Sequence, residues 1–266
     1  MKIIRFQDNT GAIRHGEWVD ERSARLIEGT LLETYRVTDQ VVAMRTLLAP
    51  VEPRTILCVG LNYRQHAGET GARIPEYPVL FIKAVNTLAH PGDPIIIPRV
   101  APEQVDCEGE LAVVIGKPGK NIERRRALDH VLGYTCANDV SARRWQKEGG
   151  GKQWCRGKSF DTFCPLGPCL VTTDEIPDPN TLRIKTTLND KTMQDSTTAD
   201  MIFDVPSLIS FLSEGTTLLP GTVILTGTPQ GVGFARNPPV FMKKGDRVAI
   251  EIERIGTLVN SVSEEG

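Results

Sequence analysis

The sequence predicts an α+β fold that is rich in β-strand and has few short helices. Short apolar or alternating segments typical of strands recur along most of the chain, whereas helical periodicity is rare. The connections between these segments are too irregular for a doubly wound parallel sheet. A length of 266 residues, 40% of them hydrophobic and 24% charged, suits one large domain or one domain with a small appendage.

A small N-terminal region, residues 1–50, is expected to precede a main domain at residues 51–266. Within the small region we expect strands at 2–6 and 13–19 and a helix around 37–49 that ends at Pro50. The segment APVEPRT, in which two prolines lie close together, is interpreted as a linker into the main domain.

In the main domain, apolar runs and a hairpin signal at Asn189–Asp190 indicate a series of strands. These are expected at 55–60, 95–98, 110–116, 133–139, 168–172, 182–188, 222–227 and 247–262. Two helices are expected. One spans 141–148 and ends in a glycine-rich turn, and the other begins after Asp204 as the cap, has Pro206 in its first turn and ends at Gly215.

Composition excludes several classes of function. A formal net charge of −2 provides no basic surface for nucleic acid, and no apolar run approaches the ~20 residues that a membrane helix needs. The six cysteines form no CxxC pair, and the four histidines lack zinc-ligand spacing, so we expect reduced thiols and no zinc. The expected compartment is the cytoplasm, or the mitochondrion if a transit peptide is missing from this chain.

The segment VDCEGELAVVIG places acids at Asp106, Glu108 and Glu110, directly before a strand that is apolar on both faces. Residues i and i+2 of a strand face the same side, ~7 Å apart, so Glu108 and Glu110 could share one ion. Without an ion the two carboxylates would repel each other, and oxygen ligands favour Mg²⁺, Mn²⁺ or Ca²⁺. The alternative is a solvated strand face. Asp106 is interpreted as solvated or as supporting the ligands.

Three further motifs each allow two interpretations. Asp139 follows a predicted strand and is either a third metal ligand or a helix cap. The glycine-rich segment TGTPQGVG at 226–233 either presents N–H groups and Thr228 to an anion or forms a plain turn. His66 lies three residues before Glu69, so the two form either a general base with its orienting carboxylate or an exposed pair on a helix.

Together and in this order, the motifs resemble those of the fumarylacetoacetate hydrolase superfamily over roughly residues 54–260. The matching segments are GLNYRQH, PVLFIKA, DCEGELAVVIGK, NDVSARRWQ, GKSFDTFCPLGP and LTGTPQGVG. Two segments, RGKSFDTFCPLGP and NPPVFMKKGD, look closest to the subfamily of fumarylacetoacetate hydrolase domain-containing protein 2. The resemblance implies a mixed β-sandwich roll that usually assembles as a homodimer.

The resemblance also implies roles for individual residues. One Mg²⁺ or Mn²⁺ would be bound by Glu108, Glu110 and Asp139. Lys158 would lie beside the ion, and His66 and Glu69 would lie on a lid and move a proton or activate water. The residues that would line the substrate pocket are Lys83, Arg143, Gln146 and Thr228.

These roles imply an enzyme that acts on small 2-oxo or 1,3-dicarbonyl acids, such as an acylpyruvate or oxaloacetate, through a metal-stabilised enolate. Hydrolytic cleavage of a C–C bond is the expected reaction, with oxaloacetate keto–enol tautomerisation or decarboxylation as alternatives. A non-catalytic binding protein is disfavoured because His66, Glu69 and Lys158 are all present. We also expect Arg143 to hold a second substrate carboxylate bidentately, and joint removal of Glu108 and Glu110 to leave the fold intact.

Overall fold

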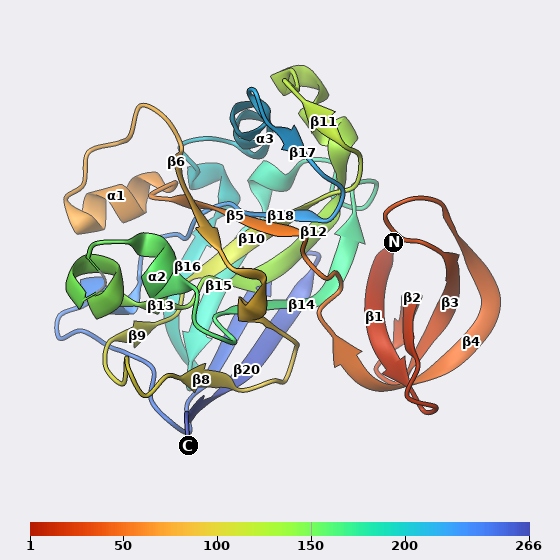
Figure 1. Ribbon diagram of the computed structural model, residues 1–266, viewed down its shortest axis with the longest axis horizontal. Helices are drawn as coiled ribbons and strands as arrows, with labels where there is room; N and C mark the ends of the chain where they lie inside the picture. Colours follow the sequence, from red (N-terminus) through yellow and green to blue (C-terminus); the bar gives the residue numbers. More distant parts are fainter. Residues whose placement is uncertain (150) are drawn as a thin grey trace.

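Two packed β-sheets form the body of the protein in the computed structural model, which describes residues 1–149 and 151–266 (Figure 1). Strands β10, β12 and β14 of the larger sheet contact β15, β19 and β20 of the smaller one, so the sheets lie face to face. The predicted β-rich α+β class, with a sandwich and few short helices, is confirmed.

The larger sheet has eleven strands and runs from the N-terminal region across the whole molecule. In spatial order its strands are β2 (Ile13–Asp20), β3 (Ser23–Gly29), β4 (Tyr35–Leu48), β1 (Lys2–Asp8), β14 (Cys164–Thr172), β12 (Val131–Asn138), β10 (Gly109–Ile115), β18 (Thr222–Leu225), β5 (Thr55–Gly60) and β6 (Val79–Lys83), with β7 (Leu88–Ala89) beside β14. Most neighbours are antiparallel, but β18 and β5 run parallel, so the sheet is mixed.

The smaller sheet has five strands. In order they are β16 (Lys191–Thr197), β15 (Arg183–Leu188), β19 (Arg247–Ile252), β20 (Gly256–Glu264) and β8 (Ile95–Ile97). The predicted hairpin joins β15 to β16, and both of its turn residues, Asn189 and Asp190, have positive φ as a tight primed turn requires. Two short pairs complete the strands, β11 (Gly119–Lys120) with β17 (Thr217–Leu218) and β13 (Ser141–Ala142) with β9 (Val105–Asp106).

Helices are short. They are α1 (Arg64–Thr70), α2 (Trp154–Lys158), α3 (Val205–Ser213), the π-helix η3 (Trp145–Gly149) and the 3₁₀ segments η1 (Val85–Thr87), η2 (Arg124–His130), η4 (Pro179–Thr181), η5 (Thr198–Asp200) and η6 (Gly233–Ala235). Helix α3 is confirmed as predicted, because the Asp204 carboxylate accepts the Ser207 N–H at 2.9 Å. None of the helices in the described residues has the length and apolar character needed to cross a membrane.

The helix predicted at 141–148 is only partly right. Its first two residues pair with β9 as strand β13, and the helical turns begin at Arg143 and continue as η3. The strand pairing satisfies backbone groups that a helix would otherwise have to pair internally.

The helix predicted around residues 37–49 is wrong, because this segment belongs to the fourteen-residue strand β4. The β-branched side chains of Val37, Thr38, Val41 and Val42 suit a strand. Strands β3 and β1 supply hydrogen-bond partners on the two sides of β4. Strand β1 also pairs with β14, so residues 2–48 extend the main sheet.

The central strand β10 is buried on both faces. Leu111, Val113 and Ile115 belong to the larger core cluster, which includes residues of both sheets, whereas Ala112 and Val114 belong to a second cluster on the opposite face. Glu110 shares the face of Ala112 and Val114 by strand alternation. The Glu110 carboxylate, near the start of β10, is therefore buried in the protein.

Candidate active site

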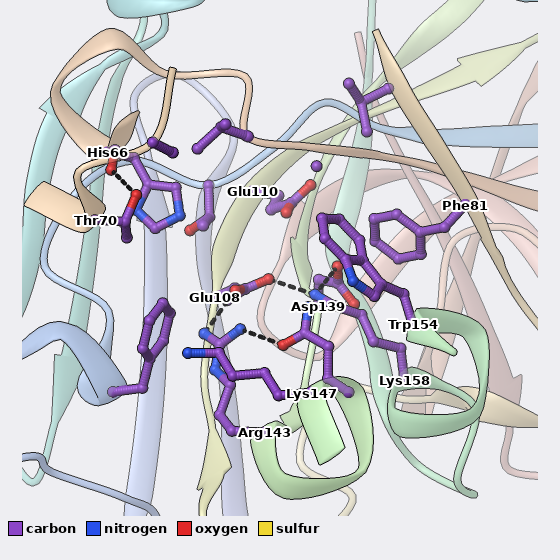
Figure 2. Close-up of a pocket in the computed structure, with 17 residues that line it drawn as sticks. His66, Thr70, Phe81, Glu108, Glu110, Asp139, Arg143, Lys147, Trp154 and Lys158 are labelled. Carbon is purple, nitrogen blue, oxygen red and sulfur yellow. Dashed lines mark hydrogen bonds and ion pairs between the residues drawn. The ribbon is translucent and has the colours of Figure 1, made fainter. Parts of the chain in front are cut away.

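A cavity of about 290 Å³ lies at the N-terminal end of β10, and residues of α1 and α2 contribute to its lining. Of the ten predicted site residues, all except Lys83 and Glu69 line it. Figure 2 shows the arrangement, with Glu108 and Glu110 between His66 and Lys158 in this view. The structure therefore brings together residues that lie more than a hundred positions apart in the sequence.

Glu108, Glu110 and Asp139 form the centre of the cavity. One carboxylate oxygen from each lies within 4.8 Å of the others, and all three side chains are buried. The antiparallel pairing of β10 with β12 causes this proximity, because Gly109 lies opposite Asn138. The Asp139 carboxylate is bound by two lysines, so the helix-cap interpretation of Asp139 is wrong.

The charges at this centre oppose one another. Burial, followed by the nearby Asp139 and Glu108 carboxylates, raises the pKa of Glu110 well above its ordinary value. A divalent cation among the three carboxylates would offset both the loss of hydration on burial and the repulsion between the like charges. Carboxylate oxygens are also the ligands that hard cations such as Mg²⁺ and Mn²⁺ prefer. The donor set therefore fits such an ion.

Two cations bind Glu108 directly. Lys158 Nζ lies 2.6 Å from Glu108 Oε2 and 2.6 Å from Asp139 Oδ2, and Arg143 Nη2 lies 2.6 Å from Glu108 Oε1. Burial disfavours ionisation of Glu108, but Arg143 and Lys158 outweigh it and lower its pKa. Burial likewise opposes the charge of Lys158, yet Asp139 and Glu108 raise its pKa.

These ion pairs argue against one expectation. Glu108 and Glu110 were expected to act as a repelling pair whose joint removal leaves the fold intact. Glu108 is instead neutralised by two buried cations, which would lose a partner on its removal. We therefore expect removal of Glu108 to destabilise the protein, and removal of the Glu110 charge alone to be tolerated.

Lys83, expected to line the substrate pocket, does not line the cavity. Its buried ammonium donates to Asp139 Oδ1 at 2.7 Å and to the Val140 carbonyl at 3.1 Å. Lys83 therefore neutralises and orients Asp139 without contacting the space that a substrate would fill.

The donors of Arg143 are largely occupied by protein acceptors. Its Nε and Nη2 donate to Asp106 Oδ2 at 2.9 and 2.7 Å, and its Nη1 donates to Gln146 Oε1 at 3.1 Å. Together with the Glu108 contact, these bonds use four of the five guanidinium N–H groups. The expected bidentate clamp on a substrate carboxylate is therefore not available, although Arg143 and Gln146 do line the cavity.

The sequence left two interpretations of Asp106 open, a solvated residue or one that supports the ligands. Its side chain is 1% exposed, so the solvated interpretation is wrong. Besides binding Arg143, its carboxylate accepts the N–H groups of Gly233 and Phe234 at 2.9 and 3.1 Å. Burial raises the pKa of Asp106, although Arg143 opposes this shift. The signal for its role was the three-acid alternation itself.

The glycine-rich loop directs its N–H groups at the protein's own carboxylates. The acceptors are Glu110 for Gly227, Glu69 for Gly231, and Asp106 for Gly233 and Phe234. These donors were expected to serve either an external anion or a plain turn, and they do neither. At Gly231, φ is 100° and a Cβ would lie 2.1 Å from the Met193 carbonyl oxygen, so only glycine fits.

Thr228, from the same loop, lines the cavity. Its hydroxyl donates to the Gly109 carbonyl at 3.0 Å and accepts from Gln194 Nε2 at 2.7 Å. These bonds hold the loop against the start of β10.

His66 and Glu69 lie on one face of α1, as their spacing predicted. His66 Nδ1 is 2.7 Å from Glu69 Oε1, and His66 lines the cavity while being 7% exposed. The histidine is therefore buried and oriented by a carboxylate, so the interpretation as an exposed pair does not hold for His66.

Comparisons with known proteins show the family to which this chain is related. Residues 55–263 match the family described as "Fumarylacetoacetate (FAA) hydrolase C-terminal". A relative from Xenopus laevis, named "Oxaloacetate tautomerase fahd2, mitochondrial", is 51% identical over 218 residues, which cover 82% of this chain and 68% of that protein.

Two solved structures are similar over the full length of both chains. A fumarylacetoacetate hydrolase from Exiguobacterium antarcticum has a TM-score of 0.88 and 38% identity. A protein from Mycobacterium smegmatis titled 5-carboxymethyl-2-hydroxymuconate delta-isomerase has a TM-score of 0.87 and 38% identity. One fold and related sequences thus carry both a hydrolase name and an isomerase name.

Proposed function

The chain belongs to the fumarylacetoacetate hydrolase family, as its motifs predicted, and from this premise we propose that it is a keto–enol tautomerase of a small 2-oxo acid such as oxaloacetate. The observation that carries the proposal is the placement of a carboxylate-oriented histidine, His66, in one cavity with the buried acid cluster. The tautomerase name of the 51% identical relative supports this reaction over the hydrolytic cleavage expected first.

Glu108, Glu110 and Asp139 would hold a divalent ion, for which Mg²⁺ and Mn²⁺ are the proposed candidates. When bound, such an ion supplies Lewis-acid stabilisation of the negative charge that develops on a 2-oxo oxygen. Four buried carboxylates lie near three buried cations, so one negative charge remains when all are ionised. The carboxylates are those of Asp106, Glu108, Glu110 and Asp139, and the cations are Lys83, Arg143 and Lys158. A divalent cation would make this cluster positive, which favours an anionic substrate.

His66 would move the proton. Its Nδ1 is held by the Glu69 carboxylate, which keeps the hydrogen on Nδ1 and leaves the lone pair on Nε2. Nε2 would then take the proton from C3 of the keto acid and deliver it to the 2-oxo oxygen, which gives the enol, and the same transfers in reverse would regenerate the keto form. The Lys158 ammonium, beside Glu108 and Asp139, would stabilise the oxygen on which charge accumulates.

Hydrolytic C–C cleavage is the second candidate. The observation that favours it is the similarity to the Exiguobacterium fumarylacetoacetate hydrolase over the full chain. The same His66–Glu69 pair would then poise a water instead of taking a substrate proton. Decarboxylation of oxaloacetate would need only the charge stabilisation.

An absorbance assay separates these reactions. Oxaloacetate in its enol form is mixed with magnesium-loaded protein and the ultraviolet absorbance is followed, while pyruvate is measured separately. We expect the keto–enol equilibrium to be reached faster without loss of oxaloacetate, and expect EDTA and His66→Asn to remove the effect. Pyruvate from oxaloacetate would indicate a decarboxylase, and acetate plus pyruvate from acetylpyruvate would indicate a hydrolase.

The homodimer and the cytoplasmic compartment stay predictions. The Xenopus relative is named as a mitochondrial protein, which supports the mitochondrial alternative for this chain.

A further inference from the structure

Lys147 is a cavity residue without a role in the chemistry described above. It lies on η3 next to Gln146, lines the cavity and has an exposed side chain. Its ammonium lies 4.0 Å from the centre of the Phe234 ring, over which Arg143 also packs at 4.3 Å. In Figure 2, Lys147 and Arg143 lie on the same side of the cavity.

The other cations at the cavity are already neutralised. Lys158 binds Glu108 and Asp139, and Arg143 has a single N–H group left after its bonds to protein acceptors. Across residues 1–149 and 151–266, Lys147 forms no ion pair with a carboxylate. Partial burial and the Arg143 charge lower the pKa of Lys147, although the Glu148 and Asp106 charges oppose the shift, so an anion placed directly beside the ammonium would be favourable.

A substrate with two carboxylates would supply that anion. Its 2-oxo acid end would bind at the divalent ion held by the acid cluster. Its other end would extend toward the mouth of the cavity, where the exposed Lys147 ammonium lies. An ammonium bound over an aromatic ring is confined to a smaller volume than a free lysine, which lowers the entropy lost on binding. A monocarboxylic acid would leave this ammonium unpaired.

We propose that Lys147 is a specificity-determining residue whose ammonium binds the distal carboxylate of a dicarboxylic 2-oxo acid. The inference rests on the proposed function only in taking a 2-oxo acid as the ligand of this cavity.

A matched pair of ligands tests the proposal by binding alone. 2-Oxoglutarate and 2-oxopentanoate have the same chain length and the same 2-oxo acid end, and differ in a distal carboxylate against a methyl group. Their dissociation constants are measured by titration calorimetry with magnesium-loaded protein. We expect the wild-type protein to prefer 2-oxoglutarate by about tenfold, which corresponds to ~1.4 kcal/mol.

Three variants identify the residue responsible. Lys147→Gln should bring the ratio of the two constants close to one, and Lys147→Arg should keep the preference. Lys152→Gln removes an exposed positive charge five residues away that does not line the cavity, and should leave the ratio as in the wild type.

The proposal is overturned if the wild-type protein binds the two ligands equally or binds neither. It is also overturned if Lys147→Gln keeps the wild-type ratio or weakens both ligands by one factor, as a structural role would. Failure of the proposed function is a separate result, because the titration needs no turnover. A protein that prefers 2-oxoglutarate through Lys147 but does not tautomerise oxaloacetate would refute the reaction and support the specificity residue.

Discussion

His66 Nδ1 lies 2.7 Å from Glu69 Oε1, and both oxygens of that carboxylate also accept the Gly231 N–H at 3.0 and 2.9 Å. Glu69 thus connects α1 to the glycine-rich loop while it orients the histidine. The contact joins a residue that lines the cavity to one that does not, and it makes the proton chemistry dependent on the position of the loop.

Replacing Glu69 should slow turnover without abolishing it. In Glu69→Gln the carboxylate that fixes the His66 tautomer is lost, and we expect kcat for oxaloacetate tautomerisation to fall about 10- to 100-fold. His66→Asn should cost more, because it removes the proton carrier itself. Both values come from the enol absorbance assay. Equal activity of Glu69→Gln and wild type would contradict the orienting role.

Removing the Glu110 charge should largely abolish the stabilisation of the protein by magnesium. Magnesium at a hundred times its dissociation constant should raise the free energy of unfolding of the wild type by about 2.7 kcal/mol, and it should raise that of Glu110→Gln little. Thermal unfolding of EDTA-treated protein, with and without Mg²⁺, measures this.

Without metal, Glu110→Gln should be at least as stable as the wild type, because a neutral amide replaces a carboxylate that burial and two neighbouring acids disfavour. Equal magnesium stabilisation of variant and wild type would exclude Glu110 as a ligand.

Asp106→Asn should cost both stability and substrate affinity. The change breaks a buried ion pair, for which we expect a loss of about 3 kcal/mol in the free energy of unfolding. It should also raise KM more than it lowers kcat, because Asp106 holds both Arg143 and the Phe234 N–H, and these two residues line the cavity. Denaturant unfolding and steady-state kinetics give the two values.

The exposed pair between Arg183 and Asp195 offers a matched control, since here too the Nε and Nη2 groups of one arginine donate to one carboxylate. Asp195→Asn should cost less than ~1 kcal/mol. If the two aspartates prove equally costly, burial of the Asp106 pair is not what makes it important.

Stability should fall when the pH drops below 6.5, partly because of His15. Burial, followed by the Arg5 charge, lowers its pKa below the ordinary value of 6.5, although the Pro50 carbonyl and Glu52 oppose the shift. The unfolded chain therefore binds the proton first, so this contribution is complete above pH 6.5 and is lost as the pH falls toward the folded pKa.

The loss is at most about 1.4 kcal/mol per pH unit for one group. Denaturant unfolding between pH 7.5 and 5 should show a smaller dependence in His15→Gln than in the wild type. An identical pH dependence in the two proteins would show that His15 does not contribute to the loss of stability.

Much of the main domain followed from local sequence, because its strands are short, apolar and bounded by turn residues. The failure at β4 has a physical reason. Its side chains allow either a helix or a strand locally, and its pairing with β3 and β1 decides between them. These partners lie outside any local window of sequence.

At the site, the spacing of Glu108 and Glu110 suggested a shared ion, but spacing could not find their counter-charges. Lys158 lies fifty residues from Glu108 along the chain, and Lys83 lies 56 residues from Asp139. Only the family resemblance pointed to these lysines. It did not indicate that Lys83 lies outside the cavity, or that the donors of Arg143 are occupied by Asp106, Glu108 and Gln146.

Because β1 pairs with β14, the first fifty residues cover what would otherwise be an edge of the main sheet. Every residue of β14 is buried, and trimming the chain to the family-matched part would leave the segment of β14 that pairs with β1, at Leu170 and Val171, as an uncovered apolar sheet edge. Such edges recruit strands from other molecules, so a shortened chain would be prone to aggregate even with every active-site residue in place.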